Sequence, residues 1–220
     1  MTNGEILAHV DHTLLKAVSS WAEIDKLCAE AVRYRTASVC VPPSYIRRIH
    51  EAYPGLVICT VIGFPLGYSV ISAKIVEAGT ALSEGASELD MVINIGDVKN
   101  GDFGVVRNEI FTLKTTMGKK ILKVIVENCY LTTEEKIRLC GIVTDAGADY
   151  IKTSTGFGTA GATLEDVLLF KEHIGPGVKI KAAGGVKTRD DLVKFLSAGC
   201  DRIGTSSAVA ILTGGGGEGY

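Results

Sequence analysis

Residues 149–159 read DYIKTSTGFGT, a short apolar strand that carries Lys152 and runs into a glycine-bearing loop. Lysine is almost never fully buried unless it is paired, and burial disfavours the charged ammonium. A lysine at the end of a strand, in a pocket, is therefore a candidate amine nucleophile. The question for the rest of the chain is which residues surround Lys152.

Apolar segments of strand length recur along the chain and alternate with segments of helix length. The predicted strands are 10–11, 37–41, 56–64, 88–95, 120–127, 149–154, 178–183 and 201–205. The predicted helices are 3–9, 21–34, 44–52, 69–83, 101–117, 132–146, 163–173 and 188–198. Such alternation indicates parallel βαβ units, and nearly continuous apolar strands indicate a sheet that is covered on both faces.

About eight strands are expected, the number that closes a (β/α)8 barrel. The prediction is therefore an α/β protein with one TIM barrel, residues 1–212, a short extra N-terminal helix, and a flexible glycine-rich tail at 213–220. A doubly wound open sheet is the alternative. No GxGxxG follows an early strand, and polar residues recur at nearly every strand end rather than at one switch point, which favours the barrel.

Composition limits the class of partner. The net charge of −2 and the absence of a basic run argue against nucleic acid and membrane surfaces, which leaves a small molecule. The longest apolar run, 56–65, is too short to span a bilayer, and residues 1–15 show no signal-peptide pattern, so a cytoplasmic location is expected. The six cysteines form no CxxC pair and no Cys/His cluster with zinc spacing, which predicts reduced thiols and no metal.

Polar residues at the predicted strand ends should meet at one mouth, because the active site of a TIM barrel lies at the carboxyl ends of its strands. They are Asp11, Cys40, Asp90 with Asn94, Glu127, Lys152, Lys181 and 204–207, with the apolar pair Phe64-Pro65 also at a strand end. Side chains alternate between the two faces of a strand. Lys152 and Asp90 can accordingly both point into the barrel, opposite Thr153 and Leu89.

These residues fit the outline of a Schiff-base lyase. The ammonium of Lys181 would repel a proton from Lys152 and leave a neutral amine that can attack a carbonyl, and Asp90 could transfer protons. The plainer alternatives stay open. A lysine in a strand more often lies at its start or extends to solvent, which is the interpretation for Lys120, Lys123 and Lys179, while Asp90 could be structural and Cys40 a wall residue.

Two glycine-bearing loops could hold a phosphate group. Gly184-Gly185-Val186 and Gly204-Thr205-Ser206-Ser207 each lead from a strand end towards a helix N-terminus. Loops after the seventh and eighth strands commonly bind phosphate in this fold. Either loop alone could equally be a turn glycine followed by an N-cap serine, so the prediction depends on the pair.

The motifs together resemble those of the deoxyribose-phosphate aldolases, a family of class I aldolases with a (β/α)8 fold. The match runs nearly end to end: DHTLL from Asp11, SVCVPP from Ser38, VIGFPLG from Val61, ELDMVINIG from Glu88, KVIVE from Lys123, YIKTSTGFGTAGAT from Tyr150, KAAGGVKT from Lys181 and RIGTSS from Arg202. As a set they are highly specific, whereas AAGGV or GTSS alone would fit many phosphate-binding barrels.

The resemblance implies reversible cleavage of 2-deoxy-D-ribose 5-phosphate to acetaldehyde and D-glyceraldehyde 3-phosphate without a metal or organic cofactor. It implies that Lys152 forms the Schiff base, that Lys181 perturbs it and that Asp90 serves a proton relay. The substrate-binding residues it implies are Asp11, Thr13, Cys40, Thr153, Gly184, Gly185, Gly204, Ser206 and Ser207. Some members end in a catalytic tyrosine, here Tyr220, although a glycine-rich tail is often plain disorder. A homo-oligomer, dimer or tetramer, is also expected.

Two rival functions remain at this point. A phosphate-binding barrel of the isomerase or synthase kind would use carboxylate acid/base chemistry without a covalent lysine. A sugar-phosphate-binding regulator would keep the pocket without catalysis, which the presence of Lys152, Lys181 and Asp90 disfavours. Trapping of the covalent adduct on Lys152 separates the aldolase from both.

Overall fold

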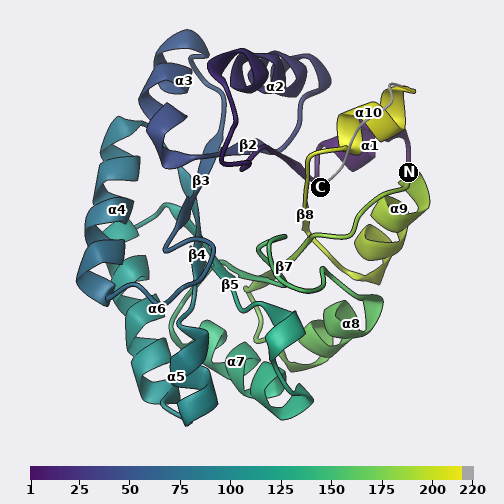
Figure 1. The fold of residues 1–220 in the computed structure, drawn as a ribbon. Helices are drawn as coiled ribbons and strands as arrows, with labels where there is room; N and C mark the ends of the chain where they lie inside the picture. Colours follow the sequence, from purple (N-terminus) through teal and green to yellow (C-terminus); the bar gives the residue numbers. More distant parts are fainter. Residues whose placement is uncertain (215–220) are drawn as a thin grey trace.

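Eight parallel strands close into a barrel in the computed structural model, which describes residues 1–214 of the chain (Figure 1). The strands are β1 (Val10–Thr13), β2 (Ser38–Val41), β3 (Ile58–Ile62), β4 (Glu88–Val92), β5 (Ile121–Ile125), β6 (Tyr150–Lys152), β7 (Lys179–Ala183) and β8 (Arg202–Thr205). Each strand pairs with the next in sequence, and β1 pairs with β8. The barrel prediction is confirmed, and the open sheet is excluded by the β1–β8 pairing.

Helices surround the barrel on the outside (Figure 1). They are α1 (Asn3–Leu7), α2 (Trp21–Tyr34), α3 (Ile46–Ala52), α4 (Ile71–Glu84), α5 (Ile95–Asn100), α6 (Phe103–Met117), α7 (Thr133–Asp145), α8 (Leu164–His173), α9 (Arg189–Ala198) and α10 (Ala208–Thr213). Capping boxes begin α2 at Ser20, α7 at Thr132 and α9 at Thr188. The pattern of the Thr132 box is visible in the sequence, where residues 132–135 read TTEE.

The short N-terminal helix α1 packs beside the last two helices of the chain. Its Ile6 and Leu7 are buried in the main core. The Asn3 side chain donates to the Leu212 carbonyl over 2.8 Å, and the Arg189 guanidinium donates to the Met1 carbonyl over 2.7 Å. These contacts tie the first helix to α9 and α10, as expected for an extra helix that precedes β1.

The segment after β4 differs from the prediction. The sequence predicts a strand over 88–95, but β4 ends at Val92 and Ile95–Asn100 forms α5. The Asn94 side chain accepts from Gly96 N over 3.1 Å and begins the helix. The run of β-branched residues hides this cap in the sequence, although Asn is among the best N-cap residues.

The apolar core has two parts. The large part lies between the strands and the surrounding helices. A small separate cluster, which we call the inner apolar cluster, consists of Leu15, Cys40, Cys59 and Val61, with Phe64 packed against it. It belongs to β2, β3 and the residues that follow β1 and β3. Within residues 1–214, no helix combines the length and apolar character needed to cross a bilayer.

A buried ion pair supports the end of β4 from outside the barrel. Lys74 of α4 is fully buried, and its Nζ lies 2.6 Å from Glu109 Oε1 of α6 and 2.8 Å from the Val92 carbonyl. Burial raises the pKa of Glu109, although the Lys74 ammonium opposes the shift. The pair therefore holds α4, α6 and the carboxyl end of β4 together.

Replacing Lys74 with Met should destabilise the fold, because Glu109 would remain buried without its partner. We expect a loss of about 3–5 kcal/mol in the free energy of unfolding, measured by urea denaturation followed by circular dichroism. The double variant Lys74→Met/Glu109→Leu should recover most of the loss, since it removes both charges. Equal stability of the single variant and the wild type would contradict this account.

Candidate active site

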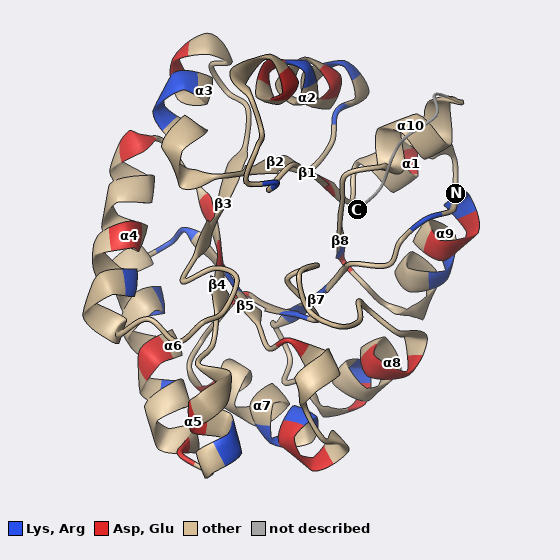
Figure 2. Ribbon diagram, in the orientation of Figure 1, with Lys and Arg blue, Asp and Glu red and all other residues tan. Residues whose placement is uncertain are grey.

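Charged side chains fill the interior of the barrel. Most Lys, Arg, Asp and Glu residues lie on the outer helices, but some lie on the strands inside the ring (Figure 2). Six of the charged residues on the strands are buried, and Arg202 is partly buried: Asp11, Glu88, Asp90, Lys123, Lys152, Lys181 and Arg202. TIM-barrel interiors are dominated by branched apolar residues, and buried charges need partners. These seven residues, named here the charged cluster, therefore require one another.

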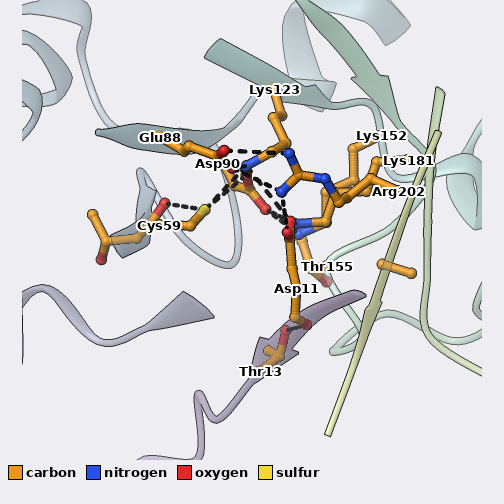
Figure 3. Close-up of polar contacts among 12 residues, drawn as sticks. Asp11, Thr13, Cys59, Glu88, Asp90, Lys123, Lys152, Thr155, Lys181 and Arg202 are labelled. Carbon is orange, nitrogen blue, oxygen red and sulfur yellow. Dashed lines mark hydrogen bonds and ion pairs between the residues drawn. The ribbon is translucent and has the colours of Figure 1, made fainter. Parts of the chain in front are cut away.

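Asp90 lies at the centre of the cluster (Figure 3). Its Oδ2 accepts from Lys152 Nζ over 2.8 Å and from Lys181 Nζ over 2.6 Å. Its Oδ1 accepts from Lys123 Nζ over 2.9 Å and from the Cys59 thiol over 3.2 Å. Strand register explains the arrangement, since Asp90 is paired with Lys123 across β4 and β5, and Lys152 with Lys181 across β6 and β7.

Lys123 corrects the sequence interpretation, which placed it at a strand start or in solvent. The side chain is fully buried inside the barrel. Its Nζ lies 2.6 Å from Glu88, 2.9 Å from Asp90 and 3.6 Å from Asp11. The flanking apolar residues in ILKVI do not distinguish this position from a solvent-reaching one, because the acidic partners come from other strands.

The amino-terminal side of the cluster joins β1, β4 and β8. Arg202 donates to both oxygens of Glu88 over 3.2 and 3.3 Å and also to Asp11. Asp11 accepts in addition from Lys181 and from the Ser38 hydroxyl. The fork of an arginine suits two carboxylates, so Arg202 closes the network across the β1–β8 seam.

The cluster shifts the pKa values of its members. Burial alone would raise the pKa of Asp90, but Lys123, Lys152 and Lys181 outweigh it and hold the pKa well below its ordinary value. Asp11 behaves likewise under Lys181, Lys123 and Arg202. Burial would lower the pKa of Lys181, whereas Asp11 and Asp90 raise it above its ordinary value. The carboxylates Asp11 and Asp90 and the Lys181 ammonium are accordingly held in their charged forms.

A cavity of about 460 Å³ opens above the cluster. Its lining includes the predicted residues Thr13, Lys152, Gly184, Gly185, Gly204, Ser206 and Ser207. The loop after β6 packs directly on the loop after β7: a Cβ on Gly161 would lie 2.4 Å from the Gly184 carbonyl carbon. Gly184 itself has a φ of +77°, which side chains rarely adopt. The two loops thus form a wall of exposed backbone beside Lys152.

The other predicted site residues lie apart from the cavity lining. Asp11, Asp90 and Lys181 are in the charged cluster beneath it, and Cys40 is in the inner apolar cluster. Thr153 faces away from Lys152, and its hydroxyl accepts from Ala183 N over 3.1 Å, which ties β6 to β7. Tyr220 lies outside the described residues.

The structure adds residues that the strand-end argument did not single out. Lys187 lines the cavity next to the glycine loops, and Thr155 lines it after β6. The Thr155 hydroxyl and the Thr155 backbone N–H both donate to the Glu127 carboxylate. Burial raises the pKa of Glu127, although these hydrogen bonds act to lower it. Lys187 follows directly on AAGGV, so its place beside the predicted phosphate loop was a usable signal.

Thiol and carboxylate atoms inside the barrel come close enough together to be considered as metal ligands. The sets Cys40, Cys59, Asp90 and Asp11, Cys59, Glu88 each have their ligand atoms within 4.8 Å of one another. However, the Lys123 ammonium contacts Cys59, Glu88 and Asp90. A metal ion would have to displace this ammonium, because the Lys123 ammonium is the cation that these thiol and carboxylate atoms already contact.

Comparison with known proteins agrees with this geometry. Residues 6–212 match the sequence model of a protein family described as DeoC/LacD family aldolase. The chain belongs to this aldolase family.

Relatives of this DeoC/LacD family include a deoxyribose-phosphate aldolase of Clostridium botulinum, 62% identical over 100% of both chains. One from Clostridioides difficile is 56% identical and covers 94% of this chain and 95% of its own. The fold is similar to a solved structure described as a tetrameric deoxyribose phosphate aldolase from Aeropyrum pernix, with a TM-score of 0.88 and 32% identity over 96% of this chain and 91% of that one. The family expected from the motifs is confirmed, and with it the class of enzyme.

The depressed pKa values of Asp11 and Asp90 predict acid sensitivity. An unfolded aspartate has a pKa of about 3.9, so the unfolded chain binds more protons than the native one below that value. The stability contributed by these carboxylates is complete above about pH 5 and is lost as the pH falls towards the lower native values. The urea concentration at which half of the protein is unfolded should therefore decrease as the pH is lowered from about 5 to about 3.

Asp11→Asn should flatten this dependence, because an amide does not titrate, while lowering stability at pH 7. Asp145→Asn on the exposed side of α7 is the matched control and should leave the slope unchanged. A slope identical in wild type and Asp11→Asn would show that the buried carboxylate is not responsible.

Proposed function

We propose that this aldolase reversibly cleaves 2-deoxy-D-ribose 5-phosphate to acetaldehyde and D-glyceraldehyde 3-phosphate through a Schiff base on Lys152. One observation carries the proposal: of Lys123, Lys152 and Lys181, Lys152 alone lines the cavity among the described residues. The relatives' names support the substrate. An amine at the floor of a cavity, beside a carboxylate and a second ammonium, supports the covalent step.

The reaction begins when the Lys152 nitrogen adds its lone pair to the C1 carbonyl of the open-chain sugar. Proton transfers through Asp90 and Lys181 convert the carbinolamine to an imine with loss of water. The C3 hydroxyl then gives up its proton and the C2–C3 bond breaks, which releases C3 to C5 as D-glyceraldehyde 3-phosphate. The electrons of the broken bond move into the protonated imine and form an enamine. Protonation at C2 and addition of water release acetaldehyde and restore the amine.

The phosphate end of the substrate fits the wall of glycine loops. The loops after β7 and β8 offer backbone N–H groups at Gly184 and Gly185 and the hydroxyls of Ser206 and Ser207. Lys187 adds a positive charge at the same side of the cavity. The sugar can then extend from this wall to Lys152, with its phosphate away from the reacting carbon.

Reductive trapping tests the Schiff base. Incubation with acetaldehyde and borohydride should add one ethyl group to the peptide that contains Lys152, detected by intact mass and peptide mapping, because the imine is reduced to a stable amine. Lys152→Ala should lose the adduct and the turnover, whereas Lys119→Ala, on the surface, should keep both. No adduct in the wild type, or ethylation spread over surface lysines, would favour the carboxylate chemistry of an isomerase or synthase.

Lys187→Gln should weaken binding of the phosphorylated substrate. We expect KM for deoxyribose 5-phosphate to rise about tenfold, as for loss of one partly exposed charged contact, with little change in kcat. Steady-state kinetics with deoxyribose, which lacks the phosphate, provide the comparison, because its kcat/KM should not change. Equal losses for both sugars would place Lys187 outside the phosphate site.

A further inference from the structure

We infer that Glu127 is a positioning residue for substrate binding: it holds the loop after β6 in the shape that places Gly184 in the proposed phosphate site. The inference rests on the proposed function, because it takes the glycine loops as the place where the substrate phosphate binds. Glu127 follows β5, is buried, and is not among the described residues that line the cavity. It therefore acts on the substrate through other residues.

The backbone of Glu127 adopts a conformation that side chains rarely take. Its φ is +55° and its ψ +68°, in the left-handed region that favours glycine. Among residues 1–214, Arg35 is the other non-glycine residue with a positive φ, and it is the C-cap of α2, where this conformation commonly ends a helix. Glu127 instead lies between β5 and a short 3₁₀ turn, Asn128–Tyr130. Strain of this kind persists only where the surrounding contacts determine the conformation.

The carboxylate of Glu127 is held by a single residue of the next loop. The Thr155 backbone N–H donates to Oε1 over 3.2 Å, and the Thr155 hydroxyl donates to Oε2. Burial raises the pKa of Glu127, which these hydrogen bonds and the nearby Lys152 oppose. A glycine would remove the backbone strain, and an apolar side chain would remove the buried carboxylate. Both unfavourable features are present together with one specific contact, the contact to Thr155.

This contact shapes the first turn of the loop after β6. The Thr155 Oγ that donates to Glu127 also accepts from the Phe157 N–H over 2.9 Å. The chain then comes back to the same neighbours, since a Cβ on Gly158 would lie 2.8 Å from Cys129 Sγ and 3.1 Å from Glu127 Cδ. The turn from Thr155 to Gly158 is therefore packed against Glu127 at both of its ends.

The loop after β6 curls around Gly184. A Cβ on Gly184 would lie 3.0 Å from the Gly161 Cα and 3.5 Å from the Gly156 Cα, so residues from both ends of the loop meet it. Gly184 has no side chain that could anchor it, and its φ of +77° belongs to the region where glycine moves freely. The position of its N–H group consequently depends on the two neighbours that enclose it.

The two ends of the loop are fastened independently. At the far end, the Ala162 N–H donates to the carbonyls of Ala183 and Gly184 over 3.0 and 3.2 Å. At the near end, Thr155 is bound to Glu127 directly before Gly156. Loss of the Glu127 side chain would release the near end alone, and Gly184 would then be enclosed on one side only.

The test compares KM for deoxyribose 5-phosphate with kcat/KM for deoxyribose, which lacks the phosphate. Glu127→Gly should fold, because glycine suits a positive φ. It should raise the KM about tenfold and leave kcat/KM for deoxyribose within about twofold, because the groups displaced are those that bind phosphate. Glu127→Gln keeps an acceptor for the Thr155 N–H and should stay near the wild-type KM. Arg35→Gly makes the same backbone change far from the cavity and should leave both values unchanged.

A double variant tests whether Glu127 acts through Thr155. Thr155→Val keeps the shape of the side chain and removes its hydroxyl. Thr155→Val/Glu127→Gly should raise the KM no further than the larger of the two single changes, because both remove the same contact. KM increases that multiply would show that the two residues act separately and would overturn this step.

An unchanged KM in Glu127→Gly, or equal losses for both sugars, would overturn the inference, since a merely structural role affects both sugars alike. Trapping on Lys152 in the wild type tests the proposed function separately: an adduct with an unchanged KM defeats the role of Glu127 alone. If no adduct forms, titration calorimetry with D-glyceraldehyde 3-phosphate replaces the kinetics. A Kd about tenfold higher in Glu127→Gly then supports the role of Glu127, and an equal Kd, or no binding by the wild type, overturns it.

Discussion

The enclosure of charge inside the barrel is the constraint on which the rest of the structure depends. A lone ion in this interior would cost far more free energy than the fold could supply, so each charged group must have partners at hydrogen-bond distance. The partners come from six of the eight strands, and they meet only if the barrel closes in one register. Asp11 reaches Arg202 because β1 pairs with β8, with Asp11 beside Gly204. The same network that holds the Lys152 amine at the cavity therefore makes the closure of the barrel specific.

The fold was predictable from local sequence patterns, whereas the placement of Lys123, which the prediction missed, depends on the long-range register between strands. Apolar strands alternating with helices indicated the barrel, and the two-residue period correctly put Lys152 and Asp90 on inward faces. The same period allows Lys123 either face, because its partners Glu88 and Asp11 belong to other strands and the register between strands is not written in any one of them. Helix α5 was missed for a local reason, since one Asn cap lies within a run of strand-forming residues.

The surroundings of the cavity differ in polarity from one side to the other. Leu15 lines the cavity and belongs to the inner apolar cluster with Cys40, Cys59 and Val61, against which Phe64 packs. The polar side is the wall of backbone N–H groups after β6, β7 and β8. The Phe64 ring meets the Phe157 ring edge to face, with centroids 5.2 Å apart, so the residues that follow β3 contact the loop that follows β6.

Two buried lysines show that burial alone does not distinguish a structural lysine from a candidate reactive one. Lys74 is as deeply buried as the barrel lysines, but it faces one carboxylate, Glu109, and the pair is balanced and distant from the cavity. The pair links α4 to α6 and has a structural role. Lys152 shares its one carboxylate oxygen with Lys181, in a cluster that already holds two further cations. Burial penalises charge at both positions, and at both a carboxylate at hydrogen-bond distance offsets the penalty. The two lysines differ in access, because Lys152 lines the cavity between the loops that follow β6, β7 and β8, whereas Lys74 lies between α4 and α6 outside the barrel. A small molecule in the cavity can therefore reach the Lys152 nitrogen but not the Lys74 nitrogen.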